Sequence, residues 1–316
     1  MPKSGTLKRI GRSSLPQSSQ EFVPARSVPE HDPKSLQSAS LPPLLSASPP
    51  TVLSIAGFDP SAGAGVLADL KTFAAHRVYG MACITALTVQ STQGVRRVQG
   101  VDAGIVTETL DCLTEDACFS SIKVGMLGSG TVAAAVAAWL RQHPNIPVIL
   151  DPVLKSSSGK DLLDSSGCEI LRNGLLARAD WMTPNLDELA ILSGESRAKS
   201  RAETEDSGRR LLQMAAIPGN HRLKLVVTDG DAATPDDLFL TRDECRWYPG
   251  ERIETTSTHG TGCAFSSALA ARVAWGDDAS AAVQAAKNYV TEALRHAFPV
   301  GQGTGPLNHV WRLTLE

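Results

Sequence analysis

The sequence predicts an α/β fold: a single domain with a central, mainly parallel sheet and helices on both faces. From residue 51 onward, short apolar runs of strand length alternate with longer segments of helical period. The helical segments are long enough to carry the chain back across a sheet, as parallel pairing requires. Hydrophobic residues make up 42% of the chain and aromatic residues only 5%, so the core must consist mainly of Val, Leu, Ile and Ala.

Each predicted element rests on its pattern. The strands are short apolar runs, most of which end in glycine or just before a polar residue: 51–57, 81–89, 121–126, 148–150, 180–182 and 224–228. The helices have apolar residues three or four positions apart, as at Val66, Leu70 and Phe73: 63–76, 104–117, 131–141, 161–178, 185–192, 201–215, 261–275 and 278–298. Residues 238–253 predict short antiparallel strands around a turn at Pro249-Gly250.

The first 50 residues differ from the rest because serine and proline dominate and no apolar period emerges. Such a segment buries too little surface to offset its ordering entropy, so we expect a disordered tail over 1–50 and a folded domain over 51–316. Four basic residues precede the first acid, Glu21, which weakly resembles a mitochondrial transit peptide, but no amphipathic helix accompanies them. We therefore expect a cytoplasmic protein, with mitochondrial targeting as the alternative.

Composition excludes several classes of function. The net charge of −3 provides no basic field for nucleic acid, and no apolar run reaches the length of a membrane span. The six cysteines form no CxxC pair, which indicates reduced thiols in place of a disulfide framework or a zinc site.

The segment Gly260-Thr261-Gly262-Cys263 stands where a long helix would begin. Unpaired N–H groups and the positive end of the helix dipole make such a terminus an anion site. We expect the same field to favour the thiolate of Cys263. The alternative is a glycine-rich helix entry with a buried cysteine.

Other polar residues follow predicted strands. Asp69 lies one turn into the first helix, where the dipole favours a carboxylate, although a plain helix-start acid would look the same. Gln90 ends the second strand, and its carboxamide can pair with the edge of an aminopyrimidine or simply cap the strand. Asp151 could hold Mg²⁺ together with Asn185 and Glu188, which lie three positions apart. Asn185 and Glu188 also fit an ordinary helix cap.

Taken in order, these features resemble the hydroxymethylpyrimidine/phosphomethylpyrimidine kinases of thiamine biosynthesis, members of the ribokinase-like superfamily. The resemblance spans about residues 51–310. The matching stretches are 56–65, 68–73, 79–81, 84–87, 123–127, 151–153, 183–186, 258–263 and 305–309.

The resemblance implies a dimeric kinase that uses ATP and Mg²⁺. It implies that the pyrimidine pocket is lined by Gly57, Asp69, Gln90, Met126 and Val153. It also implies that Gly260, Thr261 and Gly262 form the anion hole for the transferring phosphoryl group and that Cys263 is the candidate base. The resemblance also implies that Asn185 and Glu188 match a superfamily element associated with Mg²⁺ and phosphate.

Two positions depart from the family pattern. Asp229 and Ser157 stand where the family usually has lysines that could meet phosphates. Each lost contact would weaken nucleotide binding by about 1–3 kcal/mol if it is not replaced.

The leading hypothesis is therefore a kinase that phosphorylates 4-amino-5-hydroxymethyl-2-methylpyrimidine and its monophosphate. Two alternatives stay open: a pyridoxal/pyridoxine kinase, and a non-catalytic pyrimidine-binding regulatory protein.

Overall fold

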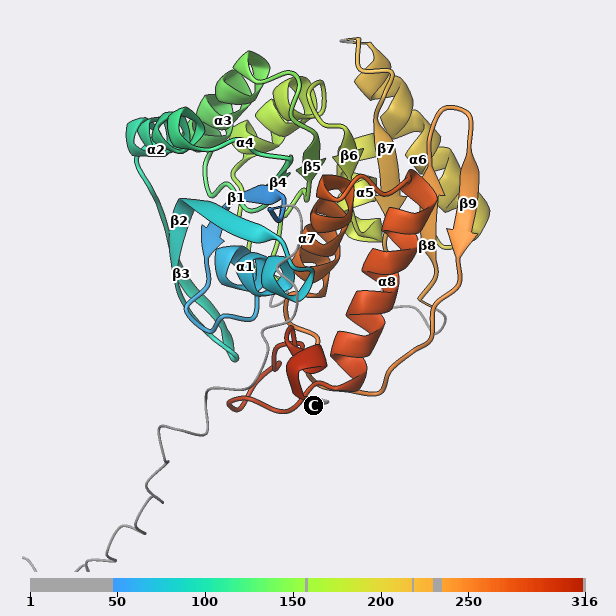
Figure 1. The fold of residues 1–316 in the computed structure, drawn as a ribbon. Helices are drawn as coiled ribbons and strands as arrows, with labels where there is room; N and C mark the ends of the chain where they lie inside the picture. The colour runs from blue at the N-terminus through green and yellow to red at the C-terminus, as the bar shows by residue number, and fades with distance from the viewer. Residues whose placement is uncertain (1–47, 157–158, 218, 230–234, 315–316) are drawn as a thin grey trace, which may run out of the picture. The chain divides into compact units, whose positions relative to one another are not determined.

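One nine-stranded sheet organises the chain, in the order β3-β2-β1-β4-β5-β6-β7-β8-β9 (Figure 1). The computed structural model describes residues 48–156, 159–217, 219–229 and 235–314, which belong to one compact unit, Ser48–Glu316. The expected tail over 1–50 lies almost entirely outside the described residues. The strands are β1 (Thr51–Phe58), β2 (Tyr79–Ser91), β3 (Gly94–Gly100), β4 (Ser121–Val124), β5 (Val148–Leu150), β6 (Trp181–Met182), β7 (Lys224–Val227), β8 (Asp237–Leu240) and β9 (Cys245–Tyr248).

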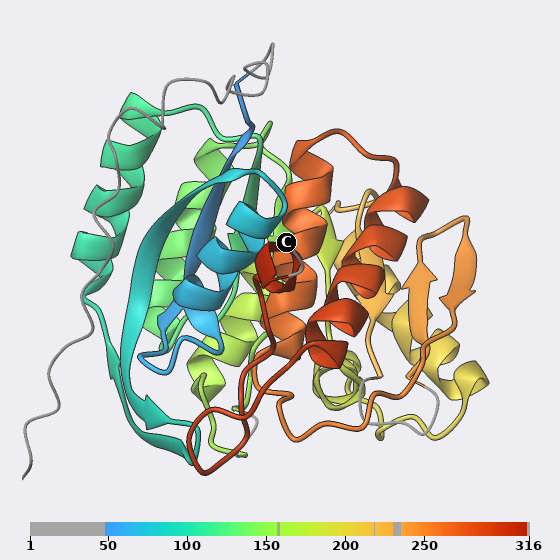
Figure 2. The same cartoon turned by 60° about the horizontal axis from the view of Figure 1, so that its bottom comes forward.

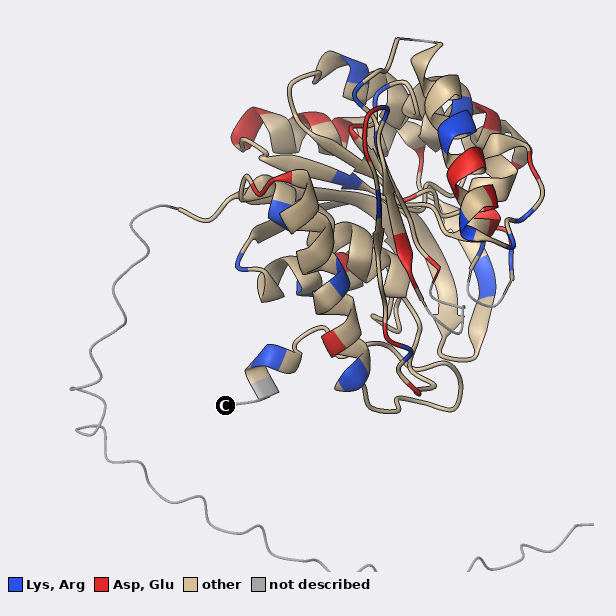
Figure 3. Cartoon of the chain, turned by 90° about the vertical axis from the view of Figure 1, so that its right-hand side faces the viewer, with Lys and Arg blue, Asp and Glu red and all other residues tan. Residues whose placement is uncertain are grey.

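Helices cover both faces of the sheet, as Figure 2 shows from a second side. They are α1 (Gly65–Ala75), α2 (Ala103–Asp116), α3 (Gly130–Gln142), α4 (Ser165–Ile170), α5 (Leu186–Ser193), α6 (Arg201–Ala216), α7 (Thr261–Ala274) and α8 (Ala279–Arg295), with a π-turn η2 (Leu171–Leu175) and a 3₁₀ turn η3 (Trp311–Thr314). Both signs of charge are interspersed over the outer helices (Figure 3). Among the described residues, no helix combines the length and the apolar character that crossing a bilayer requires.

Two apolar clusters form the core, one on each side of the sheet. Leu53 and Ile55 of β1 belong to the cluster under α2, α3, α5 and α6, whereas Val52 belongs to the cluster under α1, α7 and α8. Because successive strand residues point to opposite faces, an uninterrupted apolar run supplies both clusters at once.

The predicted fold class is confirmed, with local corrections. Strands β2, β1, β4, β5, β6 and β7 are parallel, and antiparallel strands extend both edges. Strand β3 was not predicted. The turn between the last two strands lies at residues 241–244 and not at Pro249-Gly250, which follows β9. The long helix expected over 161–178 is wrong in length, because only α4 and η2 form there.

Candidate active site

The strand order makes the carboxyl ends of β1 and β4 a topological switch point of the sheet, where α/β folds have a crevice. The chain leaves β1 through α1 on one face to reach β2, and it returns through α2 on the other face to β4. Where neighbouring parallel strands have connections that diverge in this way, ligands bind at their carboxyl ends. Gly57 and Met126 face each other at this point, because a Cβ added to Gly57 would lie 2.9 Å from Met126 Sδ.

Asp59 organises the loop that follows β1. Its Oδ1 accepts hydrogen bonds from the Ser61 N–H (2.8 Å) and the Ser61 hydroxyl (2.7 Å), and its Oδ2 accepts one from the Ala64 N–H (3.0 Å). The Nε2 of His259, just before α7, lies 2.8 Å from the same Oδ2. Burial alone would raise the pKa of Asp59, but hydrogen bonds from His259 and Ser61 outweigh it and hold the pKa below its ordinary value.

The first turn of α7 rests directly on this loop. Gly260, the N-cap, has φ +86°, and a Cβ there would lie 1.9 Å from the carbonyl oxygen of Gly63. Only glycine permits both the left-handed backbone and this close approach. A Cβ added to Gly262 would meet nothing within 4 Å, so that side of the turn is open.

The helix ends at the crevice differ from the others. In α1 and α7 no N-cap side chain accepts a hydrogen bond from the first-turn amides, although the Gly65 N–H of α1 donates to the Cys263 sulfur. In each of the other α-helices of the described residues an N-cap side chain does so, and the caps are Asp102, Ser129, Asp164, Asn185, Ser200 and Asp278. The first turn of α7 therefore presents N–H groups with no capping side chain, as an anion site requires.

Beneath α7 lies a buried charged cluster centred on Lys123 of β4. Its ammonium, wholly buried, lies 3.0 and 3.1 Å from the two carboxylate oxygens of Asp69 and 3.6 Å from Oδ2 of Asp151. Asp69 also accepts hydrogen bonds from the hydroxyls of Ser54 (2.6 Å) and Ser267 (2.7 Å). Both oxygens of Asp69 thus have protein partners, and its expected contact with a substrate stays a prediction.

The thiol of Cys263 does not have the lowered pKa expected at a helix N-terminus. Although part of the residue is accessible, burial raises the thiol pKa to about 12. Lys123 and an N–H of Gly65 oppose this rise, whereas the Asp151 and Asp69 charges add to it. The expectation of a thiolate is therefore wrong for the protein without ligands, because desolvation outweighs the dipole.

Asn185 and Glu188 form a complete capping box at the start of α5. The Glu188 N–H donates to Asn185 Oδ1 and the Asn185 N–H donates to Glu188 Oε2, both at 2.9 Å. Burial and the nearby charge of Asp151 raise the pKa of Glu188 to about 8. Among the described residues no three His, Cys, Asp or Glu side chains are grouped to hold a metal. Asp151 and Glu188 are buried carboxyl groups with raised pKa values, and a Mg²⁺ ion that takes its other ligands from water and phosphate would favour their ionised forms.

The residues expected to line a pyrimidine pocket fall into two groups. Met126 packs in a small apolar cluster with Ala86 and Leu162, and Val153 packs against it. The Nε2 of Gln90 lies 3.1 Å from His259 Nε2. Gln90 and His259 both line a cavity of about 60 Å³.

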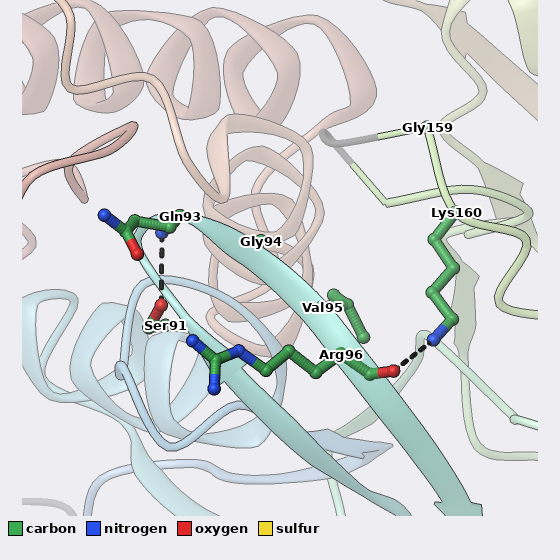
Figure 4. Close-up of a pocket in the computed structure, with 7 residues that line it drawn as sticks. All are labelled: Ser91, Gln93, Gly94, Val95, Arg96, Gly159 and Lys160. Carbon is green, nitrogen blue, oxygen red and sulfur yellow. Dashed lines mark hydrogen bonds between the residues drawn. The ribbon is translucent and has the colours of Figure 1, made fainter.

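A wider cavity of about 580 Å³ adjoins the first, since both share residues of the β2–β3 turn. Figure 4 shows its lining, where the Lys160 ammonium donates to the carbonyl of Arg96 at 2.7 Å. None of the predicted site residues lines this larger space. The smaller cavity, by contrast, touches Gln90 and His259, the residue that precedes Gly260.

Sequence reasoning assigned no role to Lys123, Asp59 or the serines of α7. The one signal available for Lys123 was a charged residue inside a predicted strand, and all four residues of Ser121–Val124 are buried. Asp229 is described and its N–H donates to the Asp237 carboxylate, whereas Ser157 lies outside the described residues.

The profile of the family described as Phosphomethylpyrimidine kinase matches residues 59–308. The hydroxymethylpyrimidine/phosphomethylpyrimidine kinase of Staphylococcus aureus (strain MRSA252) is 35% identical over 273 residues, covering 85% of this chain and 96% of the relative. The thiamine biosynthesis multifunctional protein ThiED of Corynebacterium glutamicum is 38% identical over 270 residues, which are 84% of this chain but only 34% of that protein. This chain therefore spans about a third of that relative.

Solved structures of related kinases have a backbone fold similar to that of this chain. Phosphomethylpyrimidine kinase from Clostridium difficile has a TM-score of 0.68 at 30% identity, covering 78% of this chain and 99% of that one. Pyridoxal kinase from Bacillus subtilis, solved as an ADP complex, has a TM-score of 0.75 at 29% identity, covering 84% and 100%. Pyridoxal kinase from Staphylococcus aureus with AMP-PCP and pyridoxal has a TM-score of 0.72 at 26% identity, covering 83% and 94%. With a ribokinase-like fold, an uncapped helix end at the crevice and a family match over most of its length, this chain belongs to the phosphomethylpyrimidine kinase family and is a phosphotransferase.

Proposed function

We propose that the protein transfers a phosphoryl group from ATP to 4-amino-5-hydroxymethyl-2-methylpyrimidine and then to its monophosphate, in thiamine biosynthesis. The observation that carries this proposal is the open, uncapped first turn of α7, with Cys263 in it and the Gln90–His259 cavity beside it. In phosphoryl transfer, positioning and charge stabilisation supply most of the rate enhancement.

Each site residue has a part in this reaction. The amides of Gly260, Thr261 and Gly262 donate to the phosphoryl oxygens as charge develops there. Cys263 orients the substrate hydroxymethyl group; accepting the proton of that group requires the thiolate, which the raised thiol pKa makes a minor form at neutral pH. Gln90 pairs with the aminopyrimidine edge, while Gly57, Met126 and Val153 contact the ring.

We propose that Asp151 and Glu188 hold the Mg²⁺ of the nucleotide, directly or through water. Burial raises the pKa of both carboxyl groups, and the charge of Asp151 adds to the rise at Glu188, so a divalent cation would stabilise both in their ionised form. When bound, Mg²⁺ neutralises charge on the phosphate oxygens. Asn185 holds the Glu188 carboxylate in place through the capping box. The homodimer that the resemblance implies belongs to the same proposal.

Pyridoxal is the second candidate substrate, because two pyridoxal kinases have backbones similar to this one, with TM-scores of 0.75 and 0.72. It is also a flat heterocycle with a hydroxymethyl group. Gln90 favours the aminopyrimidine, since a carboxamide matches its adjacent ring nitrogen and amine.

A coupled assay of ADP formation tests the function. The pyrimidine alcohol, its monophosphate and pyridoxal are each supplied with ATP·Mg²⁺, and then in pairwise competition. We expect turnover with both pyrimidines and a kcat/KM for the pyrimidine alcohol at least tenfold above that for pyridoxal. A reversed ratio would make pyridoxal the substrate. If none of the three compounds led to ADP formation, both the pyrimidine and the pyridoxal proposals would be refuted.

A further inference from the structure

The two carboxylates beside Lys123 are connected to the same helix, one turn after Cys263. Ser267 donates to Asp69 at 2.7 Å and Ser266 donates to Asp151 at 3.0 Å. The Ser266 hydroxyl also has the carbonyls of Gly262 (3.0 Å) and Cys263 (3.1 Å) within reach, but the charged oxygen is the stronger acceptor for its single hydrogen.

Consecutive side chains of an α-helix point about 100° apart around its axis. Hydrogen bonds from Ser266 and Ser267 to separate carboxylates therefore act in two directions around α7 and add to the core packing that limits its rotation. The same bonds hold α7 at a given distance from its neighbours, because Asp69 belongs to α1 and Asp151 follows β5 of the sheet. Cys263 lies one turn earlier and follows any movement of this turn.

Lys123 keeps the two carboxylates in place. Its ammonium lies within 3.1 Å of both Asp69 oxygens and 3.6 Å from Asp151, and without it two buried anions would face each other. Gly125 leaves the space that this ammonium occupies, since a Cβ there would lie 2.8 Å from Lys123 Nζ.

We propose that Lys123 is a positioning residue for phosphoryl transfer: by joining Asp69 to Asp151, it holds the first turns of α7 where Cys263 and the preceding amides face the substrate. The effect on turnover rests on the proposed function, whereas the effect on the helix does not. Small displacements of reacting groups cost about a hundredfold in rate, so the loss appears in kcat.

The test compares four variants with the wild-type protein. Ser266→Ala and Ser267→Ala remove one helix connection each, Gly125→Ala displaces the ammonium while keeping its charge, and Lys123→Met removes it. Arg178→Met is the matched control, since Arg178 is a buried cation bonded to Asp180 and to two carbonyls between α3 and β5, at the opposite end of the sheet. The readouts are the melting temperature, kcat and KM for the pyrimidine alcohol, and amide hydrogen exchange of a peptide covering residues 260–264.

We expect Ser267→Ala and Gly125→Ala to lower kcat about tenfold or more, to change the pyrimidine KM less than threefold, and to speed exchange in the 260–264 peptide. The control should lower the melting temperature while keeping kcat within twofold and exchange unchanged in that peptide. Should Lys123→Met fail to fold, the serine and glycine variants carry the test.

Wild-type kcat and wild-type exchange in both serine variants would overturn the proposal, and so would an equal loss of kcat in the control. A wild-type protein that does not phosphorylate the pyrimidine would refute the proposed function instead. The exchange experiment would still decide the role of Lys123.

Discussion

The imidazole Nε2 of His259 lies 2.8 Å from Oδ2 of Asp59, a contact between positions 200 residues apart in the chain. The same nitrogen lies 3.1 Å from the Gln90 amide. A carboxylate can only accept a hydrogen bond, whereas an amide can donate or accept. A His259 Nε2–H that donates to Asp59 has no lone pair left for the Gln90 NH₂, so the two contacts compete and the pairing with Asp59 affects how the Gln90 amide is oriented.

Asp59→Asn should release this constraint. We expect kcat/KM for the aminopyrimidine to fall about tenfold or more, because the Gln90 amide loses its preferred orientation. Steady-state kinetics check this, with Asp102→Asn, a change at the cap of α2, as the control. Equal losses in the two variants would argue against a specific role for Asp59.

Cys263→Ala should lower kcat about a hundredfold or more while the pyrimidine KM changes less than threefold. Cys112→Ala, at an exposed cysteine of α2, should leave kcat unchanged. Because the Cys263 thiol has a pKa of about 12, its thiolate fraction should rise tenfold per pH unit from neutral to alkaline conditions. Peptide-resolved iodoacetamide labelling should follow the same slope, and a plateau below about pH 8 would contradict it.

Glu188→Gln should raise the Mg²⁺ concentration needed for half-maximal activity about tenfold or more. Glutamine keeps an oxygen that can accept the Asn185 N–H, so the helix start survives while the charge is lost. Asp187→Asn is the control, since Asp187 is exposed and paired with Arg197. An unchanged Mg²⁺ requirement in Glu188→Gln would remove Glu188 from the metal site.

The buried His76 should make the fold less stable in mild acid. Burial lowers its pKa from 6.5 to about 4, with the Arg312 and Arg272 charges adding to the effect. As pH falls below 6.5, His76 binds a proton in the unfolded chain but stays neutral in the folded protein. Stability is therefore complete above that pH and declines toward pH 4. By this linkage, protonation of His76 in the unfolded chain lowers the free energy of unfolding by about 2 kcal/mol between roughly pH 7.5 and pH 5.

Urea unfolding of His76→Gln at the two pH values checks this. The variant should lose about 2 kcal/mol less than the wild type across the interval. Identical losses would place the acid sensitivity elsewhere, for instance at His309, whose pKa burial also lowers to about 4.

Asp229→Lys should lower the KM for ATP about tenfold, because a cation replaces a carboxylate where the resemblance implies a lysine that could meet the phosphates. Asp243→Lys makes the same charge change at an exposed position of the β8–β9 turn and should have no effect. A KM for ATP that stays within twofold in both variants would show that Asp229 does not face the phosphates.

The sequence was sufficient to predict those helices and strands whose residue pattern fits only one type of element. Continuous apolar runs identified the central strands, and the glycines around Cys263 identified the start of α7. Strand β3 was missed because Arg96 and Arg97 are exposed at the sheet edge, where no apolar alternation is needed. The last turn was misplaced because Pro249-Gly250 has the stronger turn composition, although the chain turns at residues 241–244.

The charged cluster could not be predicted for a different reason. Nothing in the local sequence pairs Lys123 with Asp69, 54 residues away, or connects both to Ser267. The thiol of Cys263 shows the same limit: the helix start was visible, but the surrounding desolvation that sets its pKa comes from segments distant in the chain.

The missing cap on α7 has a consequence for how occupancy and folding are connected. A phosphate bound to those amides would complete hydrogen bonds that a serine, aspartate or asparagine side chain completes in the capped helices. The bound nucleotide would then supply the cap that α7 lacks. Its binding would raise the melting temperature of the domain as well as begin the reaction.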